Sequence, residues 1–253
     1  MLFNYHTHTT RCNHAVGADR EYVENAVKNG VKTLGFSDHA PYVFPENKPY
    51  STFRMAVEKR DEYVASIRAL AKEYEKDIRI LCGFELEYYP AWHDQETAFL
   101  KEVNPDYLIL GQHLLGNEER VVHTKTEYRP DKVLSSYVTQ TLEGLKTGDF
   151  LYLAHPDIAG YLFSETAVSR EYLRLCEGAK ALHIPLEINL LGIRSKRQYP
   201  NRTLFKIAAE VGNEVIIGCD AHEPQHVGDL ISEKIALEMV NELGLRLIDK
   251  PLI

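Results

Sequence analysis

The chain has 253 residues, of which 37 are acidic and 29 are basic, so its formal net charge at pH 7 is −8. This acidic balance argues against binding to long nucleic acid, which depends on neutralising phosphates with lysine and arginine. No apolar run approaches the roughly 18 residues that a membrane-spanning helix needs, so no membrane association is expected. Hydrophobic residues make up 44% of the chain, enough for one sizeable core. We therefore expect a single domain over 1–253.

The start of the chain predicts a cytoplasmic location. The first predicted strand begins at Leu2 and a histidine follows at position 6, which leaves no room for the regions of a signal peptide. The cysteines form no C-x-x-C pair, which indicates free thiols in a reducing compartment. They stand at Cys12, Cys82, Cys176 and Cys219.

Short apolar runs alternate with segments of helical period along the chain. The runs predict seven strands, over 2–5, 32–36, 78–84, 107–110, 150–154, 184–188 and 215–218. Apolar residues repeat at intervals of three and four over 20–28, 63–74, 134–145 and 231–243, which predicts helices there. We expect Asp19 to cap the first of these helices, because aspartate is a favoured N-cap residue. This alternation predicts parallel α/β units, arranged as an open sheet or as a closed barrel.

Candidate metal ligands stand at the ends of six of the seven predicted strands. The first strand ends in His6-Thr7-His8, whose two imidazoles share one face because strand residues alternate. Later strand ends carry His39, Glu85, His113, His155, Asp220 and His222. The carboxyl ends of parallel strands converge on one side of such a fold, so these side chains can meet. Histidine and carboxylate without thiolate indicate zinc, manganese or iron rather than calcium.

These motifs resemble those of the PHP (polymerase and histidinol phosphatase) superfamily, and specifically its histidinol-phosphate phosphatases. The resemblance runs from residue 6 to about residue 228. It rests on His6-Thr7-His8, Ser37-Asp38-His39, Gly83-Phe84-Glu85-Leu86-Glu87, His113, Ala154-His155-Pro156-Asp157, Glu187-Ile188-Asn189 and Cys219-Asp220-Ala221-His222. It implies an α/β fold, a distorted (β/α)7 TIM-like barrel with a metal site at the C-terminal ends of the strands.

The resemblance also implies three divalent ions (zinc, manganese or iron) in a trinuclear centre. Carried onto this sequence, it assigns His6, His8, Glu85 and Asp220 to the first ion, Glu85, His113 and His155 to the second, and His14, His39 and His222 to the third. The alternative to His14 is Asp19, because some relatives have a carboxylate in this loop. Glu85 would then bridge two ions, and each ion would keep an open position.

Three divalent ions would make the site electropositive within an acidic protein, so we expect a small phosphorylated substrate and inorganic phosphate as product. The expected nucleophile is a hydroxide that bridges two ions and attacks phosphorus without a phosphoenzyme. The expected catalytic residues are Glu85, Asp220, His222 and Arg194. The resemblance indicates hydrolysis of L-histidinol phosphate to L-histidinol, a step of histidine biosynthesis.

Arg194 occupies the position at which related phosphatases carry an arginine, and a guanidinium can bind two phosphate oxygens at once. Arg197 is the alternative for this role, and Asn189 is expected to orient the substrate or a neighbouring side chain. Two loops, 40–53 and 87–94, are rich in aromatic residues. From these loops we expect Tyr42, Glu87 and Trp92 to receive the imidazole and ammonium of the substrate.

Three other functions remain open. The first is another PHP phosphoesterase, acting on nucleotides or on DNA 3′ ends with the same metals. The second is a metal-dependent amidohydrolase, although the bridging lysine usual in that family has no counterpart on the fourth predicted strand. The third is a metal-bearing interaction module without turnover, which the complete ligand set argues against.

Overall fold

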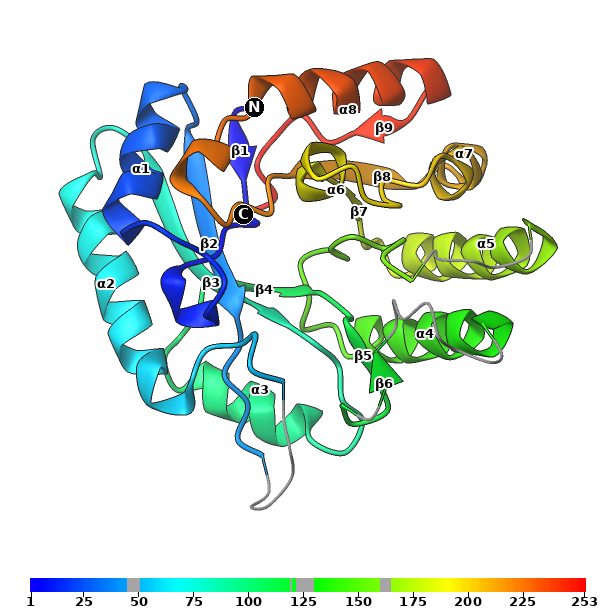
Figure 1. Ribbon diagram of the computed structural model, residues 1–253, viewed down its shortest axis with the longest axis horizontal. Coiled ribbons are helices and arrows are strands. Elements are labelled where there is room, and N and C mark those ends of the chain that lie inside the picture. Colours follow the sequence, from blue (N-terminus) through cyan, green and yellow to red (C-terminus); the bar gives the residue numbers. More distant parts are fainter. Residues whose placement is uncertain (45–50, 119, 122–129, 160–164) are drawn as a thin grey trace.

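The computed structural model describes residues 1–44, 51–118, 120–121, 130–159 and 165–253. Parallel strands form the inner layer, and helices surround them on the outside (Figure 1). Among the described residues, no helix combines the length and the apolar character needed to cross a bilayer.

The first half of the chain builds a four-stranded parallel sheet in sequence order. Its strands are β1 (Phe3–Asn4), β2 (Thr33–His39), β3 (Arg79–Leu86) and β4 (Tyr107–Leu110). The helices between them are η1 (Thr10–Cys12), α1 (Asp19–Lys28), η2 (Val57–Lys59), α2 (Arg60–Glu73) and α3 (His93–Lys101). These strands are buried except at Arg79, because helices cover the outer face.

The second half adds three more parallel strands: β7 (Leu186–Asn189), β8 (Glu214–Gly218) and β9 (Arg246–Leu247). A short antiparallel pair, β5 (Leu114–Leu115) and β6 (Arg120–Val121), follows β4. The helices are α4 (Pro130–Leu145), α5 (Glu165–Ala181), α6 (Leu190–Arg194), α7 (Arg202–Val211), η3 (Pro224–His226) and α8 (Leu230–Leu243).

Single parallel bridges join the two sheets. Leu153 bridges Leu110 on one side and Leu186 on the other, and Thr7 bridges Ala221. The expected α/β barrel-like fold is thus confirmed, with the carboxyl ends of the strands on one side. The predicted strand over 150–154 is reduced to the bridge at Leu153, so the exact (β/α)7 count is not confirmed. Pro185 has no N–H to donate, which shortens the ladder at this point.

The prediction that Asp19 caps the first helix is wrong by one residue. Ala18 is the N-cap of α1, and its N–H donates to the Glu21 carboxylate three residues later. Asp19 is the first helical residue, where a negative charge is also favourable because of the helix dipole. Its carboxylate accepts hydrogen bonds from Arg11 (3.0 Å) and Ser66 (2.6 Å).

Two glycines allow Tyr107 to cross the inner sheet beneath the strand ends. The Tyr107 hydroxyl donates to the backbone carbonyls of Tyr5 (2.7 Å) and Phe36 (3.0 Å). A Cβ atom at Gly35 would lie 2.3 Å from this hydroxyl oxygen, and one at Gly83 would lie 2.6 Å from the Tyr107 backbone oxygen. Close packing of β2, β3 and β4 therefore requires glycine at both positions.

Replacing Gly83 with alanine should lower the free energy of unfolding by about 1–3 kcal/mol, because the added methyl group meets backbone that cannot move freely. Urea denaturation measures this change. The matched control is Gly178→Ala in α5, where the methyl group meets only the end of the Leu142 side chain. An equal loss of stability in both variants would contradict the role given to Gly83.

Candidate metal centre

The structure brings all nine predicted metal ligands together at the carboxyl ends of the strands. They come from β2, β3 and the segments that follow β1, β4 and β8, with His155 after the bridge at Leu153. The nine are His6, His8, His14, His39, Glu85, His113, His155, Asp220 and His222. All except His14, His113 and His222 are buried.

Four buried atoms face one another at the centre of this cluster. His6 Nε2 lies 3.6 Å from Glu85 Oε2 and 3.7 Å from Asp220 Oδ1. His8 Nε2 lies 3.5 Å and 3.3 Å from the same two oxygens. None of these four atoms has a hydrogen-bond partner. Buried polar atoms are rarely left unpaired, and two imidazoles with two carboxylates are a suitable donor set for a divalent ion, so these residues fit a metal.

The second oxygen of Glu85 faces a different pair of histidines. Glu85 Oε1 lies 2.8 Å from His155 Nε2 and 3.6 Å from His113 Nε2. A Cβ atom at Gly111 would lie 1.9 Å from this oxygen, so only glycine leaves room for the carboxylate. One carboxylate thus faces two groups of imidazoles, as a bridging ligand would.

A third group of donors lies on the more exposed side of the cluster. His14 Nε2 and His222 Nε2 are 2.9 Å apart, and His39 completes the group. Asp19, the alternative to His14, is engaged with Arg11 and Ser66 instead. The geometry therefore places His14 with the third group of donors.

Sequence reasoning assigned no role to Glu187, which holds the central imidazoles in place. Its Oε1 lies 2.7 Å from His6 Nδ1, and its Oε2 accepts hydrogen bonds from the backbone N–H of His155 (2.9 Å) and from Asn189 Nδ2 (2.8 Å). Asn189 also donates to Asp220 Oδ2 at 3.0 Å. An N–H at His6 Nδ1 bound by Glu187 leaves Nε2 free to face the centre. The Glu187-Ile188-Asn189 motif at a strand end was the available signal.

Arg54 was also missed by sequence reasoning. This buried arginine lies 3.3 Å from Glu87 Oε2, and Glu87 Oε1 lies 3.0 Å from His113 Nδ1. Its guanidinium is 4.6 Å from the ring centroid of Phe53 and 5.4 Å from that of Tyr42. Arg54 thus connects the rings of Tyr42 and Phe53 to Glu87, and Glu87 in turn contacts the predicted metal ligand His113. Its only sequence signal was its place directly after that loop.

An open cavity of about 760 Å³ lies over the cluster. Besides the predicted ligands, its walls include Ser51, Phe53, Ser195, Arg197, Tyr199 and His226. Of the predicted substrate contacts, Arg197 is the one that lines this cavity among the described residues. Asn189, Tyr42 and Glu87 are buried behind the wall, and the Trp92 ring packs against Tyr89.

Arg194 lies beside the cluster and contacts the backbone that carries Asp220. Its Nη2 donates to the carbonyl oxygens of Cys219 (3.0 Å) and Asp220 (3.1 Å), and its Nη1 lies 3.4 Å from Asp229 Oδ2. This arginine therefore holds the loop that follows β8.

Burial and neighbouring charges shift the pKa values of the central side chains in opposite directions. Burial alone would lower the pKa of His6, but the carboxylates of Glu187, Asp220 and Glu85 outweigh it and raise this pKa to about 10. Burial would raise the pKa of Glu85, yet the imidazoles around it, His39 first among them, hold this pKa well below its usual range. Without a bound ion, the surroundings thus favour ionised carboxylates and a protonated His6.

Replacing Glu187 with glutamine should weaken metal affinity by about 10–100-fold, because the His6 ring loses the charged partner that orients it. Equilibrium dialysis with elemental analysis measures this affinity. The control is Glu177→Gln, which changes an exposed residue of α5. Unchanged affinity in the Glu187 variant would show that Glu187 does not position the ligand.

Metal binding should release protons, because a ligating imidazole must be neutral and the pKa of His6 is raised to about 10. Apparent affinity should therefore rise with pH below that value, by about tenfold per pH unit for each proton released. Calorimetric titration with zinc in two buffers of different ionisation enthalpy counts these protons. Identical heats in both buffers would contradict the assignment of His6 as a ligand.

Comparison with known proteins identifies the family. The PHP domain description matches residues 4–190. A probable histidinol-phosphatase of Deinococcus radiodurans is 28% identical over 257 aligned residues, which cover 98% of this chain and 95% of the relative. The histidinol-phosphatase of Bacillus subtilis is 34% identical over 115 residues, which cover 44% of this chain and 43% of the relative.

Solved structures show the same fold. The histidinol phosphate phosphatase of Lactococcus lactis, crystallised with zinc, L-histidinol and phosphate, has a TM-score of 0.77 and 18% identity over 97% of this chain and 95% of its own. A putative histidinol phosphatase of Listeria monocytogenes has a TM-score of 0.78 and 20% identity over 91% of this chain and 99% of its own. The chain belongs to the PHP domain family.

Proposed function

We propose that this chain is a metal-dependent phosphatase that hydrolyses a small phosphate monoester, with L-histidinol phosphate as the first candidate. The observation that carries the proposal is the cluster of buried imidazole and carboxylate atoms that face one another without hydrogen-bond partners at the base of an open cavity. The names of the relatives support this choice of substrate. So does the Lactococcus lactis structure, which holds zinc, L-histidinol and phosphate.

Three groups of side chains are proposed to hold three divalent ions. They are His6, His8, Glu85 and Asp220; Glu85, His113 and His155; and His14, His39 and His222. When bound, such ions supply positive charge for the phosphoryl oxygens and make a water molecule acidic enough to react near neutral pH. Glu85 and Asp220 contribute their ionised carboxylates, and His222 lies at the cavity wall, where it reaches the substrate.

The remaining residues are proposed to bind and orient the substrate. Arg197 lines the cavity and is placed to grip a phosphate, since its planar fork can bind two oxygens. Asn189 acts indirectly, because its side-chain amide donates hydrogen bonds that hold the carboxylates of Glu187 and Asp220 in place. Tyr42, Glu87 and Trp92 lie behind the cavity wall and are proposed to act on the organic part of the substrate indirectly. Glu87 holds His113, the Tyr42 hydroxyl donates to the Glu87 carbonyl, and Trp92 packs against Tyr89.

Phosphate release over a panel of substrates tests the function. We expect histidinol phosphate to be hydrolysed faster than nucleoside monophosphates, because the relatives of this chain are named histidinol-phosphatases. We expect an oligonucleotide to be a poor substrate, because the chain is acidic. A strong chelator should abolish the activity, and manganese or zinc should restore it.

Each outcome of the panel has a definite meaning. Equal rates on all members would contradict the choice of histidinol phosphate and leave a general phosphoesterase. A preference for nucleotides would favour another PHP phosphoesterase. Activity that survives complete metal removal would contradict the proposal as a whole.

Arg197→Ala should raise the KM for the phosphate ester while metal content stays unchanged, because Arg197 lines the cavity and is not among the proposed ligands. Arg194→Ala provides the comparison, since Arg194 was predicted to grip phosphate but contacts the Asp220 carbonyl. Steady-state kinetics measures the KM of each variant, and elemental analysis measures its metal content. Loss of metal in the Arg197 variant would contradict the role proposed for Arg197.

A further inference from the structure

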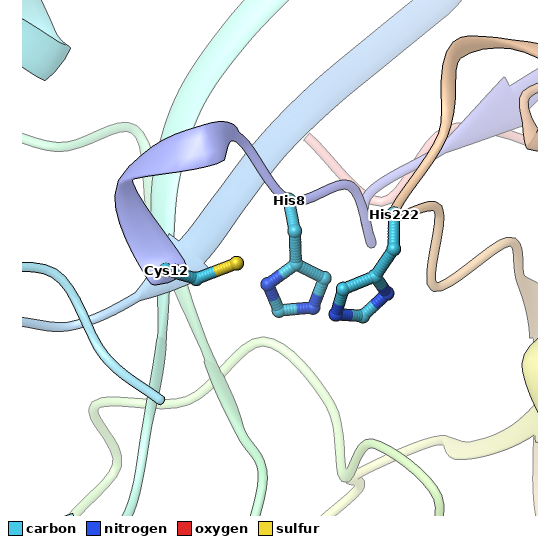
Figure 2. Close-up of side chains that lie close together, drawn as sticks. All are labelled: His8, Cys12 and His222. Atoms are coloured by element: carbon cyan, nitrogen blue, oxygen red, sulfur yellow. The ribbon is translucent and has the colours of Figure 1, made fainter. Parts of the chain in front are cut away.

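Cys12 lies against the third group of donors and belongs to none of the three proposed ion sites. It is the last residue of η1, which Thr9 caps, and its side chain is fully buried. Figure 2 shows its sulfur directed toward a ring nitrogen of His8, with His222 close by. The other three cysteines, Cys82, Cys176 and Cys219, are also buried and reduced.

The ligand atoms of His8, Cys12 and His222 all lie within 4.8 Å of one another. Donors on a single tetrahedral zinc are about 3.5 Å apart, given Zn–N and Zn–S bonds of about 2.0 and 2.3 Å. Small movements of these side chains would therefore bring the three donors onto one ion. His8 is buried, and its Nε2 faces Glu85 and Asp220. Its Nδ1 lies 3.5 Å from Asp38 Oδ1 and has no hydrogen-bond partner, so this second nitrogen remains available to a ligand.

His222 belongs to two groups of possible ligands. One consists of His14, His39 and His222, and the other of His8, Cys12 and His222. An ion in the second group would take His222 from the first and also engage His8. The two positions differ in chemistry, because a thiolate ligand favours softer ions than a position made of three imidazoles does.

We propose that His8, Cys12 and His222 form a thiolate-containing metal position that captures soft divalent ions and competes with the His14–His39–His222 position. On binding, the Cys12 thiol gives its proton to solvent and its sulfur bonds to the ion. The inference goes beyond the proposed phosphatase activity, since ion capture at Cys12 needs no substrate.

Titration of the manganese-loaded protein with cadmium tests this proposal. We expect a near-ultraviolet charge-transfer band from a cadmium–thiolate bond, and a cadmium NMR signal typical of mixed sulfur and nitrogen ligation. Cys12→Ser and Cys12→Ala should lose both signals. The matched control is Cys176→Ser in α5, a buried cysteine outside these groups, which should retain them.

The proposal stays falsifiable even if the Cys12 variants fail to fold, because the wild-type protein must itself show the signals. No thiolate band in the wild-type protein would overturn the proposal, and so would a band that persists in either folded Cys12 variant. Manganese release measured in the same titration should accompany the band, because both positions need His222. These readouts involve no substrate, so they separate this proposal from the proposed phosphatase function.

Discussion

The site depends on burying the Glu85 carboxylate among imidazoles. One of its oxygens faces His6 and His8, and the other faces His113 and His155. Desolvation of this charge is costly unless opposite charge surrounds it. The lowered pKa of Glu85 and the raised pKa of His6 reflect the same pairing. A divalent ion would give a partner to the buried nitrogen and oxygen atoms of the centre that have no hydrogen bond.

The surrounding fold is shaped to hold this arrangement. Glycine at 111 and at 218 makes room for the Glu85 and Glu187 carboxylates, because a Cβ atom at either position would lie within 2 Å of a carboxylate oxygen. Two of the proposed ligands, His155 and Asp220, have positive φ angles of 28° and 45°. Such backbone strain at non-glycine residues is typical of functional sites, where surrounding contacts maintain it.

The gathering of the proposed ligands was predictable from sequence, because the carboxyl ends of parallel strands converge. This topology brings His6 and Asp220 together without knowledge of side-chain packing. The roles of Glu187 and Arg54 were not predictable in this way. The Glu187–His6 contact depends on how the sheet curves from β7 back to β1, and the Arg54–Glu87 contact depends on a loop folding over β3. Local signals also misled at Asp19, where capping by Ala18 and Glu21 shifted the helix start by one residue.

Metal stoichiometry of the wild-type protein and of Glu85→Gln, measured by elemental analysis after metal loading and dialysis, tests the central claim most directly. If Glu85 bridges two of three ion positions, the wild-type protein should retain three ions per chain and the variant should retain at most one. Wild-type protein that retains no ion would contradict the account, as would a variant with the full complement.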